Sequence, residues 1–157
     1  MAKTWVVADI AEGKATSATL ELLTKARELG GDVEVVAFGP DVDAAAAAFG
    51  DYGATKVYKV DTGDSLAGPP VAAAMAAAIQ GGNTPDVILF AQTYDGRDVA
   101  ARLSAKIDRP LLSNVVGLDG GDRPTSSHAA FGGTLIVKAD LTAGAPQIFV
   151  VRPKSFA

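Results

Sequence analysis

Cysteine is missing from this 157-residue chain, and histidine occurs only once, as His128. Without cysteine there are no disulfides, thiolate zinc sites, iron–sulfur clusters or cysteine nucleophiles. With one histidine, a metal site built from several imidazoles is excluded, and at most one histidine can act as a general base. The sequence therefore lacks most of the side chains on which enzyme active sites usually depend.

Charged residues are also scarce, at 20% of the chain. The 14 Lys and Arg residues against 18 Asp and Glu residues give a net charge of −4, which does not favour binding to nucleic acid or anionic membranes. Hydrophobic residues make up 48%, enough to build a core. The apolar runs at residues 5–8 and 71–79 are too short for a signal peptide or a membrane span. We expect a soluble, cytoplasmic, single-domain protein.

The first two thirds of the chain alternate between strand and helix patterns. Short apolar runs rich in β-branched residues are typical of strands buried on both faces, and they occur at residues 4–9, 33–38, 56–60 and 87–91. Helical patterns lie between and after them, at residues 19–29, 44–49, 70–80 and 96–106. Thr16 or Ser17 can cap the first helix, and Asp41 or Asp43 can cap the second. Such repeats predict a parallel sheet with helices on both faces.

Beyond Asp108 the helical patterns stop. Four strand-like segments follow one another, at residues 111–118, 125–131, 134–141 and 147–151, and the connections between them are rich in turn-forming residues. We expect all four to form an antiparallel extension of the parallel core. The sequence thus predicts one α/β domain over residues 1–157, with a mainly parallel sheet and antiparallel strands at its C-terminal end.

The strand ends of this sheet carry no strong phosphate-binding motif. Open parallel sheets bind ligands beyond the carboxyl ends of their strands. No G-x-G-x-x-G follows the first strand, and Gly13-Lys14 lacks the remaining residues of a Walker loop. The most polar strand end is Gln92-Thr93-Tyr94-Asp95-Gly96-Arg97-Asp98, which opens a helix whose first amides can receive an anion. The candidate cofactor-contacting residues are therefore Thr93, Gly96 and Arg97.

A structural interpretation of the same segment is also open. Thr93 or Asp95 can cap the helix, Asp98 favours the first turn, and Arg97 can pair with a neighbouring carboxylate. The two interpretations are compatible, because different amides of the first turn can serve a cap and a ligand.

The lone histidine lies in the strand-like segment Ser126-Ser127-His128-Ala129-Ala130. A single histidine is more often structural than catalytic, and these serines are too close in sequence to form a triad with it by strand geometry. No G-x-S-x-G elbow occurs in the chain. We therefore predict no catalytic residue and no metal ligand.

Five stretches of the sequence resemble the α subunits of electron transfer flavoproteins, the FixB family. Residues 18–30 are similar to the first helix of that family. Residues 93–108, which begin Thr93-Tyr94-Asp95-Gly96-Arg97-Asp98, resemble its T-x-x-G-[KR]-D-L-x-P-R-[LV]-A-x-x-L segment, and Leu112-Ser113-Asn114-Val115 is similar to the strand that follows. Phe131-Gly132-Gly133 and Val150-Val151-Arg152-Pro153-Lys154-Ser155-Phe156 resemble its Y-[AG]-G-N and V-R-P-x-x-F motifs.

The chain departs from the family pattern at three positions. Ala101 stands where proline is usual, Asn114 where aspartate is usual, and Thr134 where asparagine is common. We therefore assign no ligand contact to these three residues.

The resemblance implies an adenine-nucleotide α-hydrolase-like α/β fold and a heterodimer of α and β subunits that holds one FAD. In this family electrons pass from flavin dehydrogenases, such as the acyl-CoA dehydrogenases of fatty acid oxidation, to a membrane quinone oxidoreductase. The family's α subunit has a second, C-terminal domain with most of the FAD site. The sequence stops at Ala157, where the family's linker begins, so the resemblance covers the N-terminal domain only.

This resemblance leads to a hypothesis with one main alternative. We expect the chain to be an electron carrier scaffold that binds no FAD alone, with the mixed sheet and the alanine-rich helices covered by the β subunit. The alternative is a stand-alone nucleotide-binding module of the universal-stress-protein type. It would need a glycine-rich phosphate loop, which Gly117-Leu118-Asp119-Gly120 and Gly121-Asp122 imitate poorly in a predicted hairpin.

Overall fold

The centre of the domain is a set of parallel strands. The structure, a computed structural model, describes residues 2–157, and over these residues its main sheet has eight strands in the order β5-β4-β1-β6-β10-β7-β8-β9. All pairings from β5 to β7 are parallel, which confirms the parallel core predicted from the strand–helix alternation. The core strands are β1 (Lys3–Val7), β4 (Asp32–Phe38), β5 (Lys56–Val60), β6 (Val87–Ala91), β7 (Leu111–Asp119) and β10 (Gln147–Val151).

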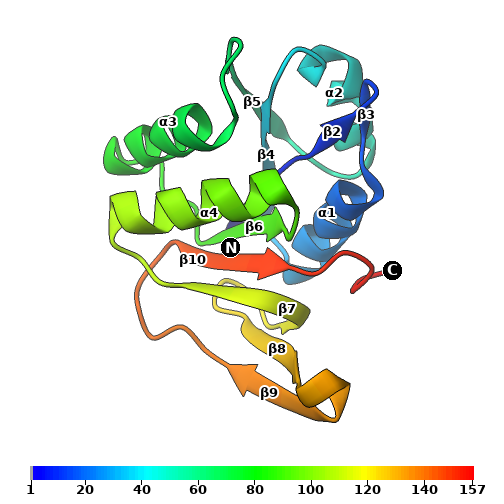
Figure 1. The fold of residues 1–157 in the computed structure, drawn as a ribbon, viewed down its shortest axis with the longest axis vertical. Coiled ribbons are helices and arrows are strands. Elements are labelled where there is room, and N and C mark those ends of the chain that lie inside the picture. Colours follow the sequence, from blue (N-terminus) through cyan, green and yellow to red (C-terminus); the bar gives the residue numbers. More distant parts are fainter. Residues whose placement is uncertain (1) are drawn as a thin grey trace.

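Helices cover both faces of this core (Figure 1). On one face lie α1 (Ser17–Leu29) and α2 (Val42–Asp51), and on the other α3 (Gly68–Gln80) and α4 (Tyr94–Ile107) lie side by side. Alternate residues of β1 supply the two cores: Val6 packs with the α1 side, and Trp5 and Val7 pack with the α3 side. A strand buried on both faces carries apolar residues on both, as Trp5, Val6 and Val7 of β1 do.

The helix ends follow the capping residues of the sequence. The side chain of Thr16 accepts a hydrogen bond from the amide of Thr19, and Gly30 is the C-cap of α1. Asp41 occupies the N-cap of α2 without a side-chain hydrogen bond. α3 has proline in its first turn. Proline is tolerated there because the N–H that it lacks would have no acceptor within the helix.

The strands beyond Asp108 only partly form the antiparallel extension. β7, β8 (Thr125–Ala130) and β9 (Leu135–Ala139) are antiparallel neighbours, with the short 3-10 turn η1 (Phe131–Gly133) between the last two. The prediction that residues 147–151 belong to this extension is wrong. β10 inserts between β6 and β7, parallel to both, because all five of its residues are buried and need cover on both faces.

A small hairpin follows β1. β2 (Ile10–Ala11) pairs antiparallel with β3 (Lys14–Ala15), and the turn between them places Glu12 at φ 52° and Gly13 at φ 73°. Gly13-Lys14 is therefore part of a hairpin rather than of a phosphate-binding loop. None of the helices formed within residues 2–157 is long and apolar enough to cross a bilayer.

Candidate functional site at the carboxyl end of the sheet

The carboxyl ends of β1 and β6 form the point where the strand order reverses. The chain runs from β1 to β4 and β5 on one side, then returns to β6 on the other side of β1. Doubly wound sheets bind ligands at this switch point. At this point a hydrogen bond joins the two strand ends. The hydroxyl of Thr93, just after β6, donates to Oδ2 of Asp9, just after β1, and the two oxygens are 3.0 Å apart.

Asp9 is held in place by its backbone as well as by its side chain. Its amide donates to Thr19 Oγ1 at 2.9 Å, and the Thr19 hydroxyl lies 3.1 Å from its carbonyl oxygen. Burial raises the pKa of the Asp9 carboxyl, the hydrogen bond from Thr93 opposes that rise, and the neighbouring charge of Asp95 adds to it. The sequence placed Asp9 at a strand end but gave no sign that it would be buried against Thr93.

Thr93 is the N-cap of α4. Its hydroxyl oxygen accepts from the amide of Gly96 at 3.1 Å, and its carbonyl oxygen accepts from the amide of Arg97 at 3.0 Å. The prediction that Thr93 or Asp95 caps this helix is confirmed for Thr93. The bond from Arg97 is the first regular bond of the helix, whereas the bond from Gly96 takes one of the free amides of the first turn and so removes one donor that an anion could use.

Gly96 is required by close packing against β6. A Cβ at this position would lie 2.0 Å from the carbonyl oxygen of Ala91 and 3.1 Å from Thr93 Oγ1. Since β6 ends at Ala91, the first turn of α4 sits directly on the strand end. The Thr-x-x-Gly spacing therefore has a structural explanation: threonine caps the helix and glycine allows the close approach.

Arg97 points away from this packed corner. Its side chain is exposed, and its guanidinium lies 5.4 Å from the centre of the Tyr94 ring, which is itself 87% exposed. The expected pairing of Arg97 with a carboxylate is not the contact found. Asp98 accepts from Arg102 Nε at 2.8 Å, one helical turn along α4. Of the three candidates, only Arg97 has a side chain directed to solvent.

A second pair of residues ties β6 to β7 at the same edge. The side-chain oxygen of Gln92 accepts from the amide of Asn114 at 2.9 Å. Asn114 has φ 55°, a left-handed conformation that asparagine tolerates better than most residues. The contact was not predicted from the sequence, because it joins residues 22 positions apart.

The lone histidine forms a hydrogen bond with one neighbouring serine, a contact that the sequence did not predict. Ser126 and His128 lie on the same side of β8, and Ser126 Oγ is 2.7 Å from His128 Nε2. His128 Nδ1 lies 2.9 Å from the carbonyl oxygen of Ser113 and Ser126 Oγ lies 3.1 Å from that of Ala139. These contacts link β8 to both neighbouring strands. Residues 2–157 contain no group of three or more His, Cys, Asp or Glu arranged to hold a metal ion.

The glycine-rich segment after β7 lies at the opposite end of the molecule from this edge. Gly121 and Asp122 line a shallow pocket with Ala2, Leu29 and Gly31, which mark the amino ends of β1 and β4. A phosphate loop in this fold class belongs at the carboxyl ends of the strands. The segment is therefore a turn between β7 and β8.

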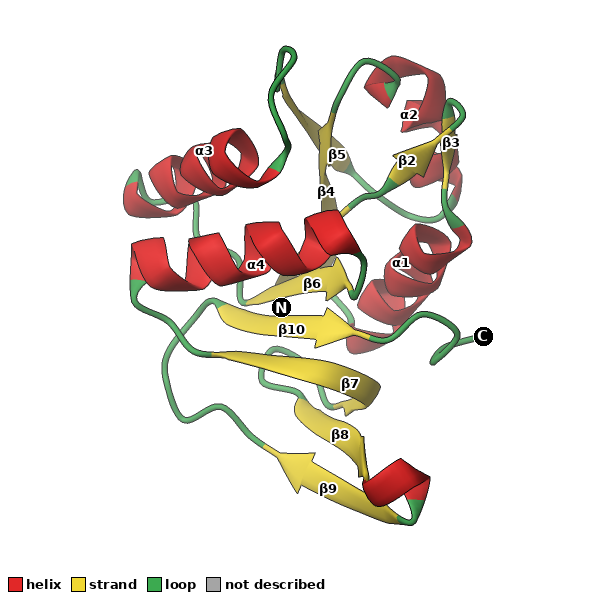
Figure 2. Ribbon diagram, in the orientation of Figure 1, coloured by secondary structure: helices red, strands yellow, loops and turns green. Residues whose placement is uncertain are grey.

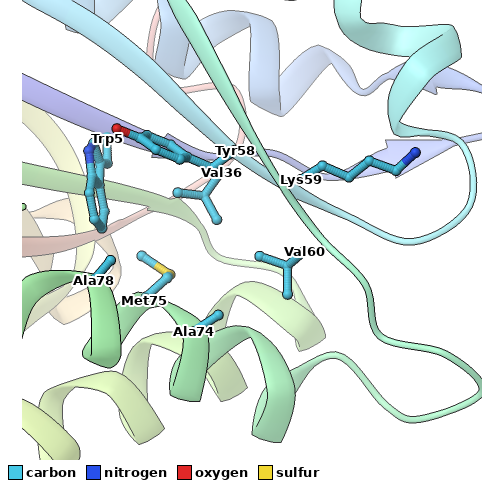
Figure 3. A pocket seen from close by; sticks show the side chains of 8 residues that line it. All are labelled: Trp5, Val36, Tyr58, Lys59, Val60, Ala74, Met75 and Ala78. Atoms are coloured by element: carbon cyan, nitrogen blue, oxygen red, sulfur yellow. The ribbon is translucent and has the colours of Figure 1, made fainter. Parts of the chain in front are cut away.

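An apolar cleft opens between the β5 edge of the sheet and α3 (Figure 3). Its volume is about 200 Å³, below the roughly 300–1,000 Å³ of pockets that hold drug-sized ligands. The residues that line it are Trp5, Val36, Tyr58, Lys59 and Val60 of the sheet side and Ala74, Met75 and Ala78 of α3.

The polar tips of the two aromatic side chains are satisfied beside this cleft. Glu34 Oε2 accepts from the indole N–H of Trp5 and from the hydroxyl of Tyr58, both at 2.9 Å. The aromatic walls are thereby fixed, and the cleft is suited to a small apolar group rather than to a charged cofactor.

Comparison with known proteins places these features in a family. A family model described as "Electron transfer flavoprotein domain" matches residues 4–157. The chain belongs to the electron transfer flavoprotein family. It is 33% identical to the electron transfer flavoprotein subunit alpha of Syntrophomonas wolfei over 98% of this chain and 49% of the relative. It is also 33% identical to the electron transfer flavoprotein subunit alpha of Mycobacterium leprae, over 96% of this chain and 47% of the relative.

The similarity to the flavoprotein subunits covers nearly all of this chain and only part of theirs. Against the subunit alpha of Bacillus subtilis it is 29% identical over 98% of this chain and 48% of the relative. The chain thus spans about half the length of the curated relatives it matches, and it corresponds to their N-terminal part. The Thr93–Gly96 cap and the parallel core lie within the residues that the family model matches.

Proposed function

We propose that this chain is the N-terminal scaffold domain of an electron transfer flavoprotein α subunit and that it forms a heterodimer with the β subunit. The observation that carries the proposal is the match of residues 4–157 to the flavoprotein family, together with relatives named subunit alpha that are about twice as long. In this function the complete heterodimer carries electrons in the cytoplasm. They pass from flavin dehydrogenases, including acyl-CoA dehydrogenases, to a membrane quinone oxidoreductase.

The FAD of that heterodimer is bound, in this proposal, mainly by the C-terminal domain of the α subunit and not by this domain alone. Two features support this. The switch point, where a doubly wound sheet binds nucleotides, is filled by the Asp9–Thr93 hydrogen bond and by the capped start of α4. The apolar cleft beside α3, at about 200 Å³, is small for a dinucleotide and offers it no phosphate-binding loop.

The chain itself then acts as a carrier domain without a reaction of its own. It contains no cysteine and one histidine, and that histidine is engaged with Ser126 and Ser113 in the sheet. A flavin supplies the redox chemistry in such proteins, and the protein supplies position and environment. Of the candidates Thr93, Gly96 and Arg97, Arg97 is the one that we propose faces a flavin held by the neighbouring domain, because its guanidinium is exposed at the carboxyl-end edge.

Co-expression tests this function. The chain is co-expressed with an electron transfer flavoprotein β subunit in two forms. The first form is this chain as it stands, and the second is this chain joined to the C-terminal half of an α subunit. We expect a 1:1 complex in both cases by analytical ultracentrifugation, with stoichiometric flavin absorbance only when the C-terminal half is present. Stoichiometric flavin in the shorter complex, or failure of the longer one to bind the β subunit, would overturn the proposal.

A further inference from the structure

Aspartate is followed by glycine at two places in the chain, Asp95-Gly96 and Asp119-Gly120. In this sequence the backbone nitrogen of glycine can attack the side-chain carboxyl carbon of aspartate, because glycine has no side chain to obstruct the approach. In a folded protein the reaction depends on how freely the peptide unit between the two residues can rotate. The structure places the two pairs in different environments.

The peptide unit between Asp95 and Gly96 is firmly held. It lies in the first turn of α4, and the Gly96 amide donates to Thr93 Oγ1 at 3.1 Å. Gly96 is buried, and a Cβ there would lie 2.0 Å from the carbonyl oxygen of Ala91. The Gly96 nitrogen can therefore turn toward the Asp95 carboxyl only if the helix loses its cap and its first turn moves away from β6.

The peptide unit between Asp119 and Gly120 is much less restrained. β7 ends at Asp119, and the chain reaches β8 through a loop (Figure 2). All five residues from 119 to 123 are exposed, and the Gly120 amide donates a hydrogen bond to no group within residues 2–157. Gly120 has φ 108°, a conformation that glycine adopts without strain. The loop thus leaves the attacking nitrogen and the carboxyl group accessible and able to move.

Asp122 provides a comparison within the same loop. It is exposed, as Asp119 is, but the residue that follows it is Arg123, whose side chain hinders attack by its own nitrogen. The chain is also fixed at this point, because Arg123 donates to the carbonyl oxygen of Leu141 at 3.0 Å and Pro124 is buried. Exposure and the glycine neighbour therefore coincide only at Asp119.

We propose that Asp119 is a site of spontaneous isoaspartate formation. The Gly120 nitrogen forms a bond to Cγ of Asp119, and its proton leaves with the carboxyl hydroxyl as water. Water then opens the resulting cyclic imide at one of its two carbonyl groups. Opening at the side-chain carbonyl restores aspartate, whereas opening at the main-chain carbonyl leaves the chain running through Cγ, which is isoaspartate. The net reaction is an isomerisation, and it does not depend on the proposed function.

The fold should tolerate the product. Isoaspartate adds one carbon atom to the main chain and converts the former main-chain carbonyl group into a side-chain carboxylate. Asp119 pairs with Thr125 at the last position of the β7–β8 register, so the added atom lies at the end of the ladder. Gly121 of the same loop lines a shallow pocket with Leu29, and the longer loop should loosen that contact. Isoaspartate should therefore accumulate in the folded chain.

Incubation of the purified chain at neutral pH and physiological temperature tests the proposal. Proteolytic digestion and mass spectrometry with electron-transfer fragmentation, which distinguishes isoaspartate from aspartate, give the rate at each position. We expect isoaspartate to form at least tenfold faster at Asp119 than at Asp95 or Asp122. A rate at Asp119 equal to that at either of the other two positions would overturn the proposal.

Unfolding the chain separates the effect of the structure from that of the sequence. In guanidinium chloride the two Asp-Gly pairs have similar freedom, so their rates should agree within about twofold. A difference that persists unchanged in the unfolded chain would show that neighbouring residues cause it, and would overturn the structural argument.

Two matched variants confirm the position in the folded protein. An isoaspartyl methyltransferase transfers a methyl group from S-adenosylmethionine to isoaspartate and not to aspartate, so methyl incorporation counts the product. Asp119→Glu keeps the charge but would have to form a larger and slower-forming ring, and should lower incorporation at least fivefold. Asp122→Glu, in the same loop, should leave incorporation unchanged. Undiminished incorporation in Asp119→Glu would overturn the assignment.

Discussion

The hydroxyl of Thr93 joins the ends of two central strands by donating a hydrogen bond to the carboxylate of Asp9 at 3.0 Å. The same oxygen accepts from the amide of Gly96 and so begins α4. One side chain thus closes the switch point of the sheet and caps the helix beside it. This arrangement occupies the place at which related architectures bind ligands.

Removing the Thr93 hydroxyl should destabilise the domain. Thr93→Val deletes both the cap acceptor and the donor to Asp9, and loss of an N-cap alone costs about 1–2 kcal/mol. Thr93→Ser keeps the hydroxyl and should stay close to wild type. Urea unfolding followed by circular dichroism measures the difference. Equal stability of the valine and serine variants would show that the cap contributes nothing.

The buried carboxyl of Asp9 should give the domain a specific pH dependence. Its pKa in the folded state is raised above the ordinary value near 3.8, so the folded chain holds this proton more tightly than the unfolded chain does. The contribution to stability is therefore full below about pH 3.8 and is lost as the pH rises through the folded-state pKa.

Asp9→Asn tests that dependence, because an amide cannot lose the proton but its oxygen can still accept from Thr93. The stability of Asp9→Asn relative to wild type should increase from pH 4 toward neutrality and then level off. Asp64→Asn, in an exposed turn, should show no such trend. Parallel stability curves for Asp9→Asn and wild type would contradict the assignment.

Gly96→Ala should be among the more damaging small substitutions. The new methyl would meet the Ala91 carbonyl oxygen at 2.0 Å, and backbone on both sides has little freedom to move. We expect a loss of about 2–3 kcal/mol, toward the upper end for overpacking. Gly144→Ala, whose added Cβ has no neighbour within 4 Å, serves as the control. Similar unfolding midpoints for the two variants would contradict the close approach of α4 to β6.

Gly68→Ala presents a contrasting case at the start of α3. Its added Cβ would lie 1.9 Å from Asp98 Oδ2, which is the end of a movable side chain. Moving it breaks the Asp98–Arg102 pair, and exposed pairs at this helical spacing contribute only about 0.2–0.5 kcal/mol. Gly68→Ala should therefore cost less than Gly96→Ala in the same unfolding assay. The reverse order would mean that the packing of α3 on α4 is tighter than described.

The sequence predicted the parts of the fold that depend on neighbouring residues. β5 and β6 were placed at their observed bounds, and Thr16 and Thr93, which cap α1 and α4, were each one of two cap residues predicted. Such predictions succeed because hydrophobic period, capping side chains and stop residues all act within a few positions of the chain. The position of β10 (Gln147–Val151) was missed, although its last four residues are all apolar, which is typical of a strand covered on both faces. Its order in the chain, after two hairpin strands, suggested an edge instead.

The candidate site was harder to predict for a physical reason. Asp9 and Thr93 are 84 residues apart, and only the parallel pairing of β1 with β6 brings them together. The Ser126–His128 contact was not predicted either, since their spacing was weighed only against a triad, although residues two apart in a strand share a face. No sequence pattern predicted that Ile136 would be exposed, since its segment has the composition of a buried strand.

Titration of the chain with FAD, followed by quenching of flavin fluorescence, tests the central claim most directly. If this domain is a scaffold whose switch point is closed by Asp9 and Thr93, FAD added at micromolar concentration should keep its free fluorescence, and no saturable quenching should develop. Saturable, stoichiometric quenching with micromolar affinity would contradict the account and assign a flavin site to the domain itself.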